Sequence, residues 1–141
     1  MIKIQLVSQE DQETFSAIAE RLQKIEYQIG EACAKCGRNR ADITVMAVTK
    51  TVAPKYINFA IRQGITLWGE NRAQELTEKY NDYILKQENI HFIGHLQTNK
   101  VRQIIDKVCL IQSVDSLRLA QEIDRQAEKR DRVMDVLLEV N

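Results

Sequence analysis

The spacing of hydrophobic positions changes once along the chain, and the change predicts two kinds of structure. Over residues 8–36, apolar side chains recur at steps of three and four, which predicts one long helix with an apolar face. The residues of this face are Phe15, Ile18, Leu22, Ile25 and Ile29. Ser8 or Asp11 is suited to cap the start of the helix, and Gly37 is suited to end it.

Beyond Gly37, short apolar runs alternate with polar turns and helical stretches. The runs that predict strands are 43–49, 65–68, 91–93, 108–112 and 133–140. The stretches between them that predict helices are 54–63, 72–86, 98–106 and 116–130. Strands that alternate with helices in this way form right-handed βαβ units, so the sequence predicts an α/β fold with a parallel sheet.

Two architectures fit this alternation: a doubly wound open sheet, and the first part of a (β/α)8 barrel of the TIM type. A closed barrel needs eight strands and typically about 250 residues. The barrel interpretation therefore places an N-terminal helix and about the first five strands in residues 1–141, as part of a single domain. Nucleotide-binding open sheets carry glycine-rich motifs such as GxGxxG or GxxxxGK[ST], and neither occurs here.

Composition excludes several classes of function. Twenty Lys and Arg balance twenty Asp and Glu, so neither a nucleic acid nor an anionic membrane surface is an expected partner. The apolar stretches are far shorter than the roughly 20 residues of a membrane span, and residues 1–5 lack the apolar core of a signal peptide. The three cysteines are expected to be reduced thiols, so the expected compartment is the cytoplasm.

Polar residues follow each of the predicted strands. They are Lys50, then Glu70 and Asn71, then His95, Ser113 and Asn141. In parallel α/β folds, functional side chains gather where the carboxyl ends of the strands meet the following loops. The sequence therefore predicts a polar rim at this edge of the sheet.

Lys50 is the most distinctive residue of the rim. Period-two alternation places Met46, Val48 and Lys50 on one face of the first strand. A lysine at the end of an apolar run is expected to be partly desolvated, which lowers the pKa of its ammonium group and favours the nucleophilic neutral amine. The alternative is a lysine that marks the exit of the strand into water, and local features alone favour it.

Asn71 and His95 also have structural interpretations. Asn71 precedes a predicted helix and Gln74 lies three residues further on, as in a capping box. His91 and His95 share a strand face, but no carboxylate or cysteine follows at a spacing typical of zinc ligands, so no metal is expected. A histidine at a strand end more often bonds to a loop.

Four segments carry a resemblance to a known family. They are 47–52 (AVTKTV), 69–75 (GENRAQE), 91–100 (HFIGHLQTNK) and 111–116 (IQSVDS). In this order they resemble the YggS/PROSC family of pyridoxal phosphate homeostasis proteins, which is similar to the N-terminal barrel of bacterial alanine racemase. The resemblance extends from the first helix to Asn141, and members of the family continue well past that point.

The resemblance implies a (β/α)8 barrel that binds pyridoxal 5′-phosphate (PLP). By motif position, Lys50 would hold the cofactor as a Schiff-base lysine, and Asn71, His95 and Ser113 would line the cofactor cavity. The family is thought to carry and buffer PLP, so the implied function is PLP homeostasis, with PLP-dependent apo-enzymes as possible recipients and no strong catalytic turnover. The alternatives are a PLP-dependent racemase-like enzyme and an inactive open-sheet fragment.

Overall fold

The fold is built on one parallel sheet. The computed structural model describes residues 7–140, and Asn141 of the predicted rim lies outside them. The strands are β1 (Ala47–Val48), β2 (Trp68–Glu70), β3 (Ile90–Phe92), β4 (Leu110–Val114) and β5 (Asp135–Leu138). They lie in the order β1-β2-β3-β4-β5, and all neighbouring pairs are parallel. Because the order never reverses, the winding is that of a (β/α) barrel and not of a doubly wound sheet.

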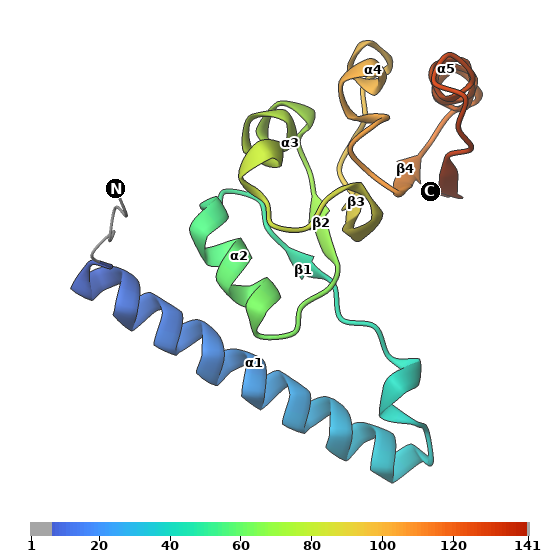
Figure 1. Cartoon of the computed structure of the whole chain (residues 1–141). Helices are drawn as coiled ribbons and strands as arrows, with labels where there is room; N and C mark the ends of the chain where they lie inside the picture. The colour runs from blue at the N-terminus through green and yellow to red at the C-terminus, as the bar shows by residue number, and fades with distance from the viewer. Residues whose placement is uncertain (1–6, 141) are drawn as a thin grey trace.

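A helical segment follows each of the first four strands. The α-helices are α2 (Pro54–Arg62), α3 (Ala73–Lys79), α4 (Val101–Ile104) and α5 (Leu117–Glu128). The short 3-10 helices are η1 (Arg40–Asp42), η2 (Tyr80–Asp82), η3 (Gln87–Asn89) and η4 (Thr98–Lys100). Figure 1 shows α2 to α5 along the outer side of the curved sheet. The alternation expected from the sequence is confirmed.

The strands are shorter than, or displaced from, the apolar runs that predicted them. The first run covers residues 43–49, but pairing with β2 begins only at Ala47, which lies opposite Trp68. The second run covers residues 65–68, whereas β2 extends from Trp68 to Glu70. Apolar runs report burial, and a ladder exists only where the neighbouring strand runs alongside, so the two kinds of boundary differ.

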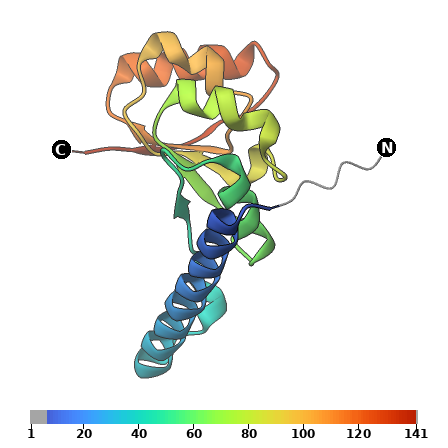
Figure 2. The same ribbon diagram turned by 90° about the vertical axis from the view of Figure 1, so that its left-hand side faces the viewer.

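The long N-terminal helix is confirmed as α1 (Gln9–Cys36). The Oγ of Ser8 accepts a hydrogen bond from the backbone N–H of Asp11 at 3.1 Å, and Gly37 ends the helix with a φ of 68°. The apolar face is only partly covered: Phe15 stacks on Phe59 of α2 with ring centroids 4.6 Å apart. Figures 1 and 2 show α1 beside α2 and extending beyond the rest of the molecule.

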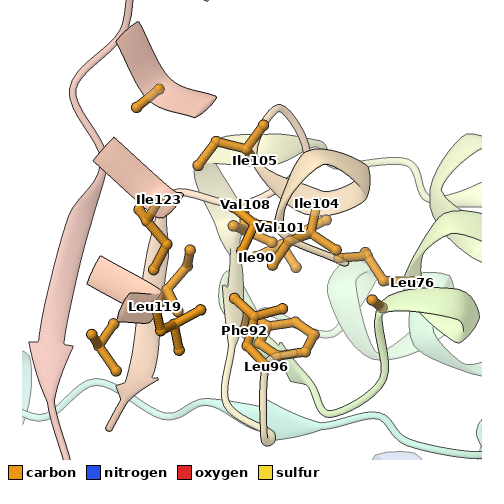
Figure 3. Close-up of a cluster of buried hydrophobic side chains, with 14 of the residues drawn as sticks. Leu76, Ile90, Phe92, Leu96, Val101, Ile104, Ile105, Val108, Leu119 and Ile123 are labelled. Carbon is orange, nitrogen blue, oxygen red and sulfur yellow. The ribbon is translucent and has the colours of Figure 1, made fainter. Parts of the chain in front are cut away.

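The hydrophobic core lies between the sheet and helices α2 to α5. Its side chains include Leu76, Ile90, Phe92, Leu96, Val101, Ile104, Ile105, Val108, Leu119 and Ile123, which Figure 3 shows packed against one another. The opposite face of the sheet is more open: Val48 is 51% exposed. No helix within residues 7–140 is long and apolar enough to cross a membrane.

Candidate functional site

The fold brings the four candidate residues to the carboxyl edge of the sheet. Lys50 lies two residues after β1, Asn71 directly follows β2, and His95 lies three residues after β3. Ser113 lies within β4, near its end. Since the strands are parallel and consecutive, all four residues belong to the same edge.

Lys50 is exposed, so the expected partial desolvation is wrong. The strand β1 ends at Val48, and Lys50 stands in the turn that follows it, exposed to solvent as Val48 is. The buried residue is Thr49 instead. Its Oγ donates a hydrogen bond to Oε1 of Glu70 at 2.6 Å. The lysine amine therefore stands in solvent while the residue before it is fixed in the core.

The turn that carries Lys50 is anchored on both sides. Thr51 has a φ of +62°, and its backbone N–H donates to Oε1 of Glu75 at 2.5 Å. Lys79 forms an ion pair with Glu75 and donates to the carbonyl oxygen of Thr49 at 3.4 Å. Burial raises the pKa of Glu75, but the hydrogen bonds from Lys79 and Thr51 outweigh it, so the pKa lies below its usual range.

Glu70 is a fully buried carboxyl at this edge, and sequence reasoning assigned no role to it. Its Oε1 accepts hydrogen bonds from Thr49 and from the hydroxyl of Tyr83, the latter at 2.7 Å. Burial and the neighbouring Glu70 raise the pKa of Tyr83, which keeps its phenol protonated as a donor. The available signal was a carboxylate two residues after Trp68, where the apolar run ends.

The capping interpretation of Asn71 is wrong. Arg72 occupies the N-cap of α3 with no side-chain hydrogen bond, and the amide of Gln74 donates to Glu78 at 2.9 Å. The Oδ1 of Asn71 is buried and has no hydrogen-bond partner in the protein. Gly94 packs directly on this residue, because a Cβ at position 94 would lie 2.1 Å from the carbonyl oxygen of Asn71.

His95 and Ser113 differ in their surroundings. The side chain of His95 is 75% exposed, with Nδ1 3.5 Å from Oδ2 of Asp115. Ser113 is buried, and its Oγ donates to the carbonyl oxygen of Gly94 at 2.5 Å. A cavity of about 230 Å³ is lined by Asn71 and His95, among others, but by neither Lys50 nor Ser113.

The two histidines do not form a shared ligand set. Nδ1 of His91 lies 2.8 Å from Nε2 of Gln112, so this ring nitrogen is engaged by an amide. Burial lowers the pKa of His91, which favours the neutral ring. Among residues 7–140, no group of three or more His, Cys, Asp or Glu side chains is arranged to hold a metal ion.

The chain is similar to known proteins over most of its length. No protein-family profile matches it. A pyridoxal phosphate homeostasis protein of Aquifex aeolicus is 43% identical over 124 residues, which cover 86% of this chain and 54% of that protein. A protein of the same name from Escherichia coli is 32% identical over 127 residues, which cover 88% of this chain and 54% of the relative. The chain thus spans about half the length of the curated relatives it matches.

A solved structure shares both sequence and fold. PipY of Synechococcus elongatus, solved without PLP, is 32% identical with a TM-score of 0.74, and the match covers 88% of this chain and 54% of PipY. The PLP-bound structure of PipY matches over the same shares at 30% identity with a TM-score of 0.64. Since both identities are at least 30%, the chain is similar to PipY in sequence as well as in fold.

Proposed function

Because the chain is a homologue of the pyridoxal phosphate homeostasis proteins over about half of their length, we propose that it contributes Lys50 to a PLP site and serves PLP homeostasis. The support comes from PipY, whose solved structure with PLP bound is 30% identical to 88% of this chain. On this proposal, residues 1–141 are the N-terminal part of one PLP-binding (β/α) barrel domain.

The observation that carries the proposal is the unpartnered Oδ1 of Asn71. A buried acceptor without a donor costs roughly 1–3 kcal/mol. It stands at the same sheet edge as the exposed amine of Lys50, and a ligand that offers both a carbonyl carbon and a hydrogen-bond donor satisfies both groups. PLP has an aldehyde, a phenolic hydroxyl and a ring nitrogen that can carry a proton, so the residues at this edge fit it.

Each candidate residue has a role in this proposal. Lys50 attaches the cofactor through its amine, Asn71 accepts a hydrogen bond from it, and His95 offers an exposed imidazole at the cavity. Ser113 acts through Gly94, whose carbonyl oxygen it holds. When bound, PLP supplies an aldehyde conjugated to an electron-withdrawing ring.

The proposed role is carriage and buffering, with no strong catalytic turnover. PLP-dependent apo-enzymes are the proposed recipients, because they need the same aldehyde in an exchangeable form. We also propose a cytoplasmic location, which the three free cysteines support. These thiols are Cys33, Cys36 and Cys109.

The test is selective attachment to Lys50. The 141-residue chain is incubated with PLP, reduced with borohydride, weighed intact and mapped by peptides. The lysine amine adds to the aldehyde carbon, water leaves, and hydride makes the bond permanent, so each bound cofactor is counted. We expect one adduct on Lys50, absent in Lys50→Ala and retained in Lys55→Ala, an exposed lysine five residues away. Label scattered over many surface lysines in the unaltered chain would overturn the proposal.

A further inference from the structure

The turn that carries Lys50 contains a backbone conformation that its residue type disfavours. Thr51 has a φ of +62°, in the left-handed region. A β-branched residue is rarely found there, because its Cβ crowds the following carbonyl oxygen. Such conformations persist only where the surrounding structure enforces them, and they cluster at functional sites.

Helix α3 supplies the contacts that enforce it. The carboxylate of Glu75 accepts the backbone N–H of Thr51 at 2.5 Å, across 24 residues of sequence. Lys79, one turn further along the helix, pairs with Glu75 and donates to the carbonyl oxygen of Thr49. The side chains of Glu75 and Lys79 are only 15% and 14% exposed, so water competes weakly for these bonds.

These contacts surround Lys50 without touching its amine. Thr49 on one side is bound at its carbonyl oxygen by Lys79 and at its hydroxyl by Glu70. Thr51 on the other side is bound at its N–H by Glu75. The backbone of Lys50 therefore has little freedom, whereas its side chain stays exposed.

We propose that Glu75, paired with Lys79, is a positioning residue that fixes the direction in which Lys50 leaves the sheet edge. The inference rests on the proposed role of Lys50 as the attachment point. A lysine held on a rigid turn reaches a bound aldehyde with less loss of conformational freedom than one on a mobile loop. Glu75 thus favours attachment of PLP to Lys50 over other lysines, although it never contacts the cofactor.

The first measurement needs no cofactor: hydrogen exchange of the Thr51 amide by NMR. We expect Glu75→Ala to accelerate that exchange by at least about tenfold, as loss of a charge-assisted hydrogen bond implies. Glu75→Gln keeps a neutral acceptor and is expected to lie between Glu75→Ala and the unaltered chain. Glu78→Ala is the matched control on the same helix, since within residues 7–140 the side chain of Glu78 forms a hydrogen bond only with the side chain of Gln74.

The second measurement is the share of PLP label on Lys50 relative to Lys55 after borohydride reduction. We expect Glu75→Ala and Glu75→Gln to lower this share and Glu78→Ala to leave it unchanged. Far-UV circular dichroism establishes that each variant is folded, and Glu75→Gln decides the matter if Glu75→Ala unfolds.

The outcomes separate the two proposals. If Glu75→Gln is folded and has the Thr51 exchange rate and the Lys50 share of the unaltered chain, the positioning role is overturned and the attachment role stands. If the unaltered chain shows no preference for Lys50, the attachment role is overturned, and the positioning role, which rests on it, falls with it.

Discussion

The hydroxyl of Tyr83 donates a hydrogen bond of 2.7 Å to Oε1 of Glu70, a carboxyl with no solvent exposure. The hydroxyl of Thr49 donates to the same oxygen at 2.6 Å, and Oε2 of Glu70 has no protein partner. A buried carboxyl is tolerated when it is hydrogen-bonded, so these two hydroxyls stabilise Glu70 in its buried position at the end of β2. Through Thr49 they also join the end of β2 to the turn that carries Lys50.

Replacing Tyr83 by Phe removes one of the two donors and keeps the aromatic ring, whose centroid lies 5.4 Å from that of Trp68. We expect the free energy of unfolding to fall by about 1 kcal/mol, because Oε1 of Glu70 loses one of its two donors and keeps the hydroxyl of Thr49. Urea denaturation followed by circular dichroism measures the change. Tyr27→Phe on the exposed side of α1 is the control and is expected to stay within about 0.5 kcal/mol of the parent. Equal effects at the two positions would contradict the role given to the Tyr83 hydroxyl.

The left-handed conformation of Thr51 predicts an unusual preference for glycine. Glycine adopts a φ of +62° without a Cβ clash, whereas alanine retains the clash. We therefore expect Thr51→Gly to be more stable than Thr51→Ala by about 1 kcal/mol, measured by thermal denaturation.

The same pair of substitutions at Thr66, an exposed residue without a positive φ, provides the control. There alanine is expected to equal or exceed glycine in stability, because glycine gives the unfolded chain more freedom. If alanine were also the better residue at position 51, the strain assigned to Thr51 would be absent.

The lowered pKa of Glu75 predicts how its contribution to stability depends on pH. Burial raises this pKa, but the hydrogen bonds from Lys79 and Thr51 bring it below the ordinary value of 4.5. The folded state therefore favours the ionised carboxylate, whose contribution is complete above about pH 4.5 and is lost as the pH falls through the lowered value.

The measurement is the difference in unfolding free energy between the parent and Glu75→Gln, taken from pH 7 down to pH 3. We expect the parent to be more stable at pH 7 and the difference to shrink on acidification. Glu78→Gln, on the same helix, is expected to follow the parent throughout. A difference between the parent and Glu75→Gln that does not vary with pH would show that the charge of Glu75 is irrelevant to the fold.

The contact between Gly94 and Asn71 predicts a severe steric effect. A Cβ at position 94 would lie 2.1 Å from the carbonyl oxygen of Asn71, and that backbone cannot yield as a flexible side chain does. We expect Gly94→Ala to lower the unfolding free energy by about 3 kcal/mol. Gly30→Ala, inside α1 with nothing within 4 Å of the new Cβ, is expected to raise it by up to about 1 kcal/mol. Denaturant titration of both variants measures the contrast.

Much of the fold could be predicted because hydrophobic spacing is a local property. The change of period after Gly37 located α1 and the alternation of strands and helices, and Ser8 caps α1 as expected. Period-two alternation grouped Val48 with Lys50, and both are exposed whereas Thr49 between them is buried. Hydrophobic spacing alone left barrel and open sheet both possible; the family resemblance implied the barrel, and the order of the strands confirms it.

The surroundings of the candidate site could not be predicted, because they depend on contacts between distant residues. The exposure of Lys50 follows from which face of the sheet the helices cover, and periodicity alone cannot say which face that is. The capping interpretation of Asn71 failed because it requires the helix boundary to within one residue, and α3 begins at Ala73 with Arg72 as its N-cap. The hydrogen bond from Thr51 to Glu75 joins residues 24 positions apart, and no periodicity in the sequence indicates it.

The 28 residues of α1 give the molecule a shape that bears on how it behaves in solution. At 1.5 Å per residue the helix is about 42 Å long, whereas a compact chain of 141 residues has a radius of gyration of about 14 Å. In Figure 1 its C-terminal half extends past α2, so the chain experiences more friction than a sphere of equal mass. Its elution volume in gel filtration therefore corresponds to a mass above 16.3 kDa even for a single chain, and only a shape-independent method such as light scattering distinguishes that effect from self-association.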